Sequence, residues 1–276
     1  GRYGEAYAIF NELSGYKDAD ALKEKADEEI AIMQAPMGQI FASFYEYYAG
    51  LVTIPEQYTG IEMEKLTEQE FQEYVYAHVK EKMGMAMGPW GDIVWEPEVR
   101  FSDAAASFMS NGKYPTEESY KAYLRMICED EKYTPILREY LLNTSSVPSH
   151  DEEYIRKQLS KALFAFSSEL AQYGVDIDTY IQIEGYNSFD EFRSEREQVI
   201  LENDTILIAA YAIGKKEGIV ITEEMFLEMA DEFAYEYGIT TEHFLELNDR
   251  KVLEQIFMIE CGMEFMIDNA KFIEKE

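Results

Sequence analysis

Residues 147–174 read VPSHDEEYIRKQLSKALFAFSSELAQYG and predict the first long helix of a helical domain. Ser149 is followed three residues later by Glu152, which is the spacing of a capping box at a helix N-terminus. Apolar residues then recur at intervals of three and four, so they share one face of a helix. They are Ile155, Leu159, Leu163, Phe166, Leu170 and Tyr173. Gly174 is expected to end the helix, because glycine adopts positive φ without strain.

The same kinds of helix start and stop signals recur further along the chain. Ser188 with Glu191 forms a second capping box, which predicts a helix that continues to Gly218. Thr222 is an expected N-cap, and Gly238 is the matching stop. A series of separate helices, each with its own start and end signal, is therefore expected in this half of the chain.

Other segments extend the helical prediction in both directions. Thr67 and Glu70 form another capping box, so a helix is expected from there onward. A further helix opens at Pro115, and Pro135 should kink or restart it. Residues 252–273 are apolar on more than one side and should pack between neighbouring elements. The predicted fold class is mainly α, with little β structure.

The chain is strongly acidic. Its 276 residues include 24 Lys and Arg against 55 Asp and Glu, a formal net charge of −31. Such a surface repels phosphate backbones and anionic lipid, so neither nucleic acid nor a membrane is an expected partner. The sequence has no run of about 20 consecutive apolar residues of the kind that crosses a bilayer. With 47% hydrophobic residues, a soluble globular protein is predicted.

Few residues offer catalytic or metal-binding chemistry. Cys128 and Cys261 stand alone, without the spacing of a metal site, and are expected to be buried thiols. His78, His150 and His243 lie on separate segments, where surface or capping roles are expected. The sequence contains no phosphate-binding glycine loop, nucleophile elbow or zinc-helix motif. It therefore predicts no cofactor, no metal and no enzyme activity.

Several short motifs follow one another in a recognisable order. They are IPEQYTGIEMEKLTEQE at 54–70, Val147-Pro148, GVDIDTYIQIEG at 174–185, GKKEGIVITEEMF at 214–226 and DNAKFIEKE at 268–276. In this order they resemble the linker and the C-terminal chaperone domain of the trigger factor family. The resemblance implies a trigger factor C-terminal-like helical body with antiparallel arm helices.

Two other parts of that family have no counterpart in these motifs. In the family, the linker leads into a β-rich prolyl isomerase domain, but here only residues 84–114 separate two helical segments, with GDIV at 91–94. The Gly-Phe-Arg and Gly-Lys loop of the ribosome-docking domain does not occur. The resemblance therefore implies a chaperone body without isomerase activity or ribosome docking.

Residues 1–35 are expected to form a small unit of their own. They resemble one degenerate tetratricopeptide-like hairpin, in which Gly15 turns the chain into a second helix near Asp18. One hairpin cannot bury its apolar face alone, so it needs preceding repeats or the body; a plain helical pair leading into the domain is the alternative. The predicted chaperone domain spans 36–276, with 36–114 as linker and first helices and 115–276 as body and arms. The hairpin is a candidate contact for a protein partner.

Methionine and aromatic residues are abundant, with 13 Met, 21 Tyr and 16 Phe. A methionine side chain is flexible and polarizable, so a surface built from it can adapt to many sequences. Seven such residues crowd the last helices and are candidates for binding a client polypeptide: Met225, Met229, Phe257, Met258, Met263, Phe265 and Met266. At helical spacing the same residues can also form the core, and both roles stay open.

The predicted function is that of an ATP-independent holding chaperone that binds unfolded or nascent polypeptides in a helical cradle. Weak contacts at several points suit this task, because the client must leave without nucleotide energy. Two alternatives are a helical scaffold protein that binds one defined partner and an extracytoplasmic secretion chaperone of similar architecture. A cytoplasmic location is expected unless a signal or anchor precedes Gly1.

Overall fold

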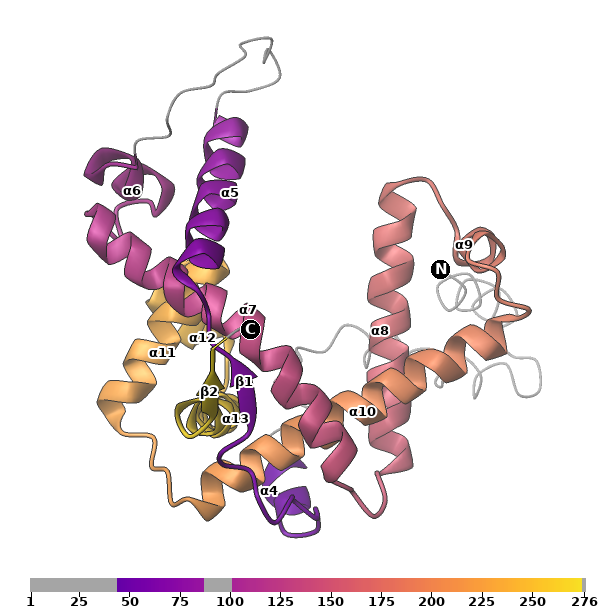
Figure 1. The fold of residues 1–276 in the computed structure, drawn as a ribbon. Coiled ribbons are helices and arrows are strands. Elements are labelled where there is room, and N and C mark those ends of the chain that lie inside the picture. The colour runs from indigo at the N-terminus through magenta and orange to yellow at the C-terminus, as the bar shows by residue number, and fades with distance from the viewer. Residues whose placement is uncertain (1–43, 87–100, 275–276) are drawn as a thin grey trace, which may run out of the picture. The chain divides into compact units, whose positions relative to one another are not determined.

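A computed structural model describes residues 44–86 and 101–274 (Figure 1). Ten helices and two short strands make up the regular structure of these residues, which confirms the mainly α class. The hairpin predicted at residues 1–35 and the GDIV segment at 91–94 lie outside the described residues.

The chain divides into two compact units. Unit 1 comprises Gly1–Glu56 and Leu141–Glu264, and unit 2 comprises Gln57–Tyr140 and Phe265–Glu276. Each unit therefore combines segments that are distant in the sequence. The predicted domains, 1–35 and 36–276 with a subdivision after residue 114, stay predictions.

Unit 2 brings the linker motif and the C-terminal motif together. Its elements are β1 (Glu62–Glu64), α5 (Glu68–Ala86), α6 (Asp103–Met109), most of α7 (Glu117–Thr144) and β2 (Lys271–Ile273). The two strands pair in parallel, with Met63 opposite Phe272 (Figure 1). Tyr133 of α7 fixes the end of this pair, because its buried hydroxyl accepts a hydrogen bond of 2.8 Å from the backbone N–H of Leu66.

Helix α5 begins at the predicted capping box. The Thr67 hydroxyl accepts a hydrogen bond of 3.2 Å from the Glu70 N–H, and the Glu70 carboxylate accepts one of 2.9 Å from the Thr67 N–H. Phe71, Val75 and Val79 follow at intervals of four residues and are all buried. The capping box and the apolar stripe thus set both the start of the helix and its buried face.

Helix α7 runs through Pro135 without a restart. Of the two expected effects of this proline, a restart of the helix is therefore wrong, while a kink stays a prediction. Proline removes one backbone N–H from the helix and leaves the carbonyl of the residue four positions earlier without its usual partner. Here Pro135 is exposed, so water can satisfy that group, while Leu137 and Leu141 keep the following turns in the core.

Among the described residues of unit 1, the regular elements are helices, and one isolated antiparallel bridge joins Thr53 to Ser146. The helices are α4 (Phe44–Ala49), α8 (Glu152–Gln172), α9 (Ile177–Ile183), α10 (Phe189–Lys216), α11 (Glu223–Glu236), α12 (Thr241–Leu247) and most of α13 (Arg250–Asp268). Helices α11, α12 and α13 share one core cluster, built from Phe226, Ala230, Ala234, Phe244, Leu253 and Phe257. Helix α13 is buried on several sides, as its all-round apolar sequence predicted.

Most predicted helix ends are confirmed. Ser188 and Thr222 are the N-caps of α10 and α11, and Gly174, Gly218 and Gly238 follow helix ends with φ of 70°, 72° and 66°.

The predicted start of α8 is wrong. Its N-cap is Asp151, whose carboxylate accepts a hydrogen bond of 2.7 Å from the N–H of Tyr154. Asp151 stands directly before the helical run, whereas Ser149 lies two residues further upstream. Aspartate caps as strongly as serine and adds a negative charge that the helix dipole favours.

Candidate polypeptide-binding surface

The structure places most of the predicted client-binding residues in the interior. Phe257, Met258, Met263 and Met266 are buried, with exposed fractions of 8% or less. The remaining three, namely Met225, Met229 and Phe265, are half-buried. In this structure the first four therefore have a packing role, and the binding role of the seven residues stays a prediction.

A different part of unit 1 is barely buried. Between residues 160 and 203, only Ile181 and Phe192 are buried, whereas most residues from Asp204 to Gly214 are. We call residues 160–203 the arm; it comprises most of α8, all of α9 and the first half of α10 (Figure 1). A helical pair with so few buried residues packs mainly on itself, so the arm is a projecting element rather than part of the core.

Aromatic contacts hold the arm together. The ring of Phe166 on α8 lies 5.6 Å from that of Phe192 on α10 and 4.8 Å from that of Tyr180 on α9. Tyr186 adds a contact of 5.2 Å with Phe192, and the guanidinium of Arg196 lies 5.0 Å from the same ring. Phe192 is thus the centre of a small aromatic cluster joining all three helices, with cation–π support from Arg196.

Helices α8 and α10 run in broadly opposite directions and cross obliquely (Figure 1). Phe166 on α8 lies beside Phe192, while Tyr154, near the start of α8, lies beside Asp204, later on α10. Moving toward the N-terminus of α8 therefore means moving toward the C-terminus of α10. The chain runs out along α8, turns through α9 and returns along α10 (Figure 1).

The outer surface of the arm combines apolar and acidic side chains. Its exposed large apolar residues are Phe164, Tyr173, Ile183, Phe189 and Val199. Tyr173 and Ile183 are 77% and 72% exposed, which leaves most of both side chains in water. Within residues 160–203 there are nine Asp and Glu but only three Lys and Arg. Single apolar side chains separated by charged ones can make several weak contacts with an apolar ligand while the surface stays hydrated.

The base of the arm contains a buried carboxyl group. Asp204 is 4% exposed and lies among Tyr45 of α4 and Tyr154 of α8, which are also buried. Burial raises the pKa of Asp204 to about 7 and outweighs the opposite effect of the neighbouring Tyr154 hydroxyl. In the sequence the only sign of this group is one acidic residue at the start of the apolar run TILIAAYAIG.

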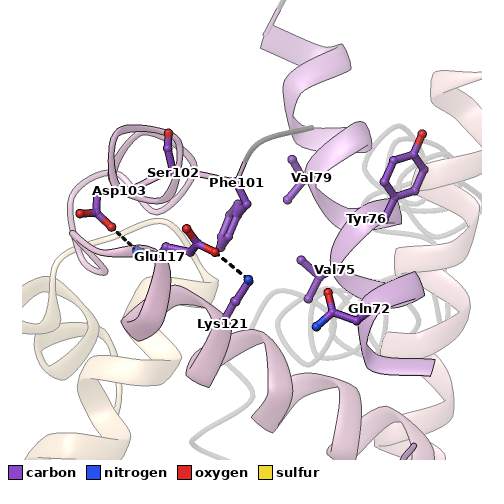
Figure 2. A pocket seen from close by; sticks show the side chains of 9 residues that line it. All are labelled: Gln72, Val75, Tyr76, Val79, Phe101, Ser102, Asp103, Glu117 and Lys121. Atoms are coloured by element: carbon purple, nitrogen blue, oxygen red, sulfur yellow. Dashed lines mark hydrogen bonds and ion pairs between the residues drawn. The ribbon is translucent and has the colours of Figure 1, made fainter. Parts of the chain in front are cut away.

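Unit 2 carries a separate open groove of about 710 Å3, lined by both polar and apolar side chains, between α5, α6 and α7 (Figure 2). Val75 and Val79 of α5 line it on one side, and Phe101 projects into it from the segment before α6. At its rim, the Lys121 ammonium donates a hydrogen bond of 2.7 Å to Glu117 and lies 5.5 Å from the Phe101 ring. The charged groups Lys121 and Glu117 thus pair with each other, and the rest of the groove offers both polar and apolar surface.

The histidines and cysteines do not come together. His78 Nε2 lies 2.8 Å from the hydroxyl of Tyr120 in unit 2, whereas His243 is exposed and lies 3.5 Å from Glu246 in unit 1. Burial lowers the pKa of both His78 and His150, which favours their neutral forms.

Cys128 and Cys261 are buried, as predicted, and burial raises the pKa of both thiols. Within residues 44–86 and 101–274, no group of three or more His, Cys, Asp and Glu side chains is placed to hold a metal ion. The same residues include no helix that is both long and apolar enough to span a bilayer.

The segment that contains the arm matches a known protein family. Residues 146–261 match the model of the bacterial trigger factor protein (TF) C-terminus. These residues are therefore similar to the C-terminal part of trigger factor. The matched segment includes the arm and most of α11–α13, which are the elements that the motif order had assigned to the chaperone domain.

Individual trigger factors match over a longer part of the chain. The trigger factor of Staphylococcus epidermidis strain ATCC 35984 is 24% identical over 234 residues, which is 81% of this chain and 49% of the relative. The trigger factor of Staphylococcus aureus strain Newman is 25% identical over 127 residues, or 45% of this chain and 28% of the relative. The chain therefore spans about half the length of the first of these relatives. No solved structure matches the chain significantly.

Proposed function

We propose that this protein is a holding chaperone, which binds unfolded or partly folded polypeptides without ATP. The observation that carries the proposal is the arm, where large apolar side chains are exposed on helices with little burial. The arm lies in the segment that is similar to the trigger factor C-terminus. Exposed apolar side chains of this kind mark sites for binding other chains. A chaperone role accords with the family model that residues 146–261 match.

The chemistry of the arm favours weak, repeated contacts. Tyr173 and Ile183 are mostly exposed, whereas Phe192 is buried. The two exposed side chains can therefore contact a client without disturbing the aromatic cluster around Phe192. Each exposed side chain contributes about 1–3 kcal/mol when fully covered, and several such contacts on one client add avidity. Because each contact is weak, the client can leave without nucleotide energy. The acidic residues between them keep the complex in solution.

A test of the proposal measures aggregation of a chemically denatured model protein after dilution, followed by light scattering in the absence of nucleotide. At a several-fold molar excess, this protein should suppress scattering strongly. The arm variant Tyr173→Ser/Ile183→Asn/Val199→Ser should lose most of that effect, because it removes three exposed apolar side chains and leaves Phe192 in place.

The chain offers a matched control outside the arm. Val220, Tyr237 and Leu247 are 72%, 70% and 59% exposed on other parts of unit 1, so Val220→Ser/Tyr237→Ser/Leu247→Asn removes comparable apolar surface. The control variant should keep its activity. Equal loss in both variants would locate binding outside the arm, and no suppression by the unchanged protein would overturn the chaperone function. Tight binding of one folded protein with no affinity for unfolded chains would instead favour a scaffold role.

We also propose that the chaperone works without prolyl isomerase activity and without docking on ribosomal RNA. In support of the first, the described part of the segment between α5 and α7 forms helix α6 and turns, where the family has its isomerase domain. In support of the second, a net charge of −31 opposes contact with phosphate backbones. Refolding of a protein limited by proline isomerisation should show no acceleration when this protein is added, and an acceleration that scales with its concentration would refute the first proposal.

A further inference from the structure

The base of the arm contains a buried carboxyl group, which apolar cores rarely contain. Asp204 is 4% exposed, and its Oδ2 atom has no hydrogen-bond partner among the described residues. A buried carboxylate with one unsatisfied oxygen is strongly unfavourable even beside the Tyr154 hydroxyl, and such a group normally stays protonated in the folded state. An amide or an apolar residue at position 204 could not ionise. With an aspartate there, the stability of the folded state depends on pH.

The surroundings of Asp204 come from three helices. Tyr45 and Tyr48 face it from α4, and Tyr154 faces it from α8. Just before α8, His150 lies 6.1 Å from the Tyr48 ring, and the Asp151 carboxylate also influences Tyr48.

On the side of Leu201, just before Asp204, Arg156 of α8 and Arg193 of α10 line a groove together with His150. On α10 itself, Tyr211 lies 6.1 Å from the Tyr45 ring. Helix α13 presents Met258 and Gly262 where it meets α10 at Gly214 and Ala210. Within the described residues, no Lys or Arg offsets the charge of Asp204.

The same residues attach α4 to the arm. The ring of Phe44 stacks on that of Tyr154 at 3.9 Å, so α4 is pressed against the start of α8 next to Asp204. Phe44, Tyr45 and Tyr48 are all buried, although α4 is only six residues long. So short a helix has almost no stability of its own, and its attachment depends on these contacts.

We propose that Asp204 and its tyrosine neighbours form a proton-dependent clamp, in which neutral Asp204 keeps α4 packed against the base of the arm and ionised Asp204 loosens it. Ionisation places a negative charge among Tyr45, Tyr48 and Tyr154, and no Lys or Arg of residues 44–86 or 101–274 balances it. Water must then reach the carboxylate, and α4 is the smallest element that can move to admit it. The inference concerns the attachment of α4 and does not depend on client binding.

The direction of the pH effect follows from the two states. In the unfolded chain Asp204 ionises near its ordinary pKa of 3.8, while in the folded protein its pKa is raised to about 7. Between these two values the unfolded state releases a proton that the folded state keeps, so stability falls as pH rises. Below the lower value both states are neutral, and above the upper value both are ionised, so this contribution no longer changes.

The test compares the full chain with Asp204→Asn at pH 5 and pH 8, using thermal unfolding and hydrogen exchange of the backbone amides of residues 44–49 corrected for intrinsic rates. In the unchanged protein, protection of these amides should fall at least tenfold from pH 5 to pH 8. Asp204→Asn should abolish this change and raise Tm at pH 8 by about 5 °C. The control Glu202→Gln, which removes a partly exposed acid from the same helix, should behave like the unchanged protein.

A second variant covers the case in which Asp204→Asn does not fold. The Tyr154 hydroxyl lowers the pKa of Asp204, so Tyr154→Phe should move the midpoint of the protection change to higher pH. An unaltered midpoint in Tyr154→Phe, or the same pH dependence in Asp204→Asn as in the unchanged protein, would overturn the proposal.

Discussion

A Cβ atom placed on Gly262 would lie 2.1 Å from the carbonyl oxygen of Ala210, so α13 and α10 meet backbone to backbone at this point. Gly214 makes a similar approach one turn further along α10, where a Cβ atom would lie 2.8 Å from the sulfur of Met258. Side chains normally hold packed helices 8–10 Å apart. At Gly214 and Gly262 no side chain separates the two helices. The base of the arm on α10 therefore packs closely against α13, which contributes to the core of unit 1.

Gly262→Ala is therefore expected to destabilise unit 1 by about 1–3 kcal/mol, because the added methyl group must push two backbones apart. Urea denaturation followed by circular dichroism measures the change. Gly50→Ala is the matched control, since the nearest atom to its new Cβ lies at an ordinary contact distance of 3.6 Å. A Gly262→Ala variant as stable as the unchanged protein would mean that α10 and α13 are not in backbone contact.

The hydrogen bond between the Leu66 N–H and the Tyr133 hydroxyl should be important for unit 2. Tyr133→Phe removes the acceptor and leaves a buried N–H unsatisfied, which is expected to cost about 1–3 kcal/mol. Tyr74→Phe removes an exposed hydroxyl that donates to Glu131 at 3.2 Å, and it should change stability little. Similar losses in the two variants, measured by thermal unfolding, would contradict a special role for the buried bond.

Pro135 is expected to weaken α7. Replacement of this exposed residue by alanine restores one helical hydrogen bond and should stabilise the protein by about 1–3 kcal/mol. Glu139→Ala, one turn later on the same helix and also exposed, should have little effect. If Pro135→Ala instead lowers the unfolding temperature, a bend at the proline is required for packing of α7.

The capping box of α5 can be tested with two substitutions of Thr67, one of which keeps the hydroxyl group. Thr67→Ala should destabilise the helix start by about 1 kcal/mol, because the Glu70 N–H loses its acceptor. Thr67→Ser keeps a hydroxyl and should retain most of the stability. Hydrogen exchange at the Glu70 amide is the specific readout, and equal protection in both variants would argue against the capping role.

Local signals in the sequence predicted the helices well. Thr67, Ser188 and Thr222 stand where the structure has N-caps, because a cap is satisfied by atoms only a few residues away. The spacing of Ser149 and Glu152 alone placed the start of α8 at Ser149, and the prediction took no account of Asp151. Asp151 is the one that stands directly before the helical run.

Contacts between residues that are distant in the chain were not predicted from the sequence. The pairing of Met63 with Phe272 joins strands from distant parts of the chain, and three-residue strands have too few residues to show an alternating pattern. The four buried candidates among the methionine and aromatic residues show the same limit. Spacing puts Met258 on a helix face, but only the neighbouring helix decides whether that face meets protein or water.

The sequence by itself determined the helical class, the acidic surface, most of the helix ends and the trigger factor resemblance, because each depends on composition or on residues close together in the chain. Tertiary structure alone decided which apolar residues are exposed on the arm, how Gly262 and Ala210 meet, and that Asp204 is enclosed by tyrosines from two other helices. The physical reason is that burial is a property of two surfaces in contact, and one segment of sequence specifies only one of them.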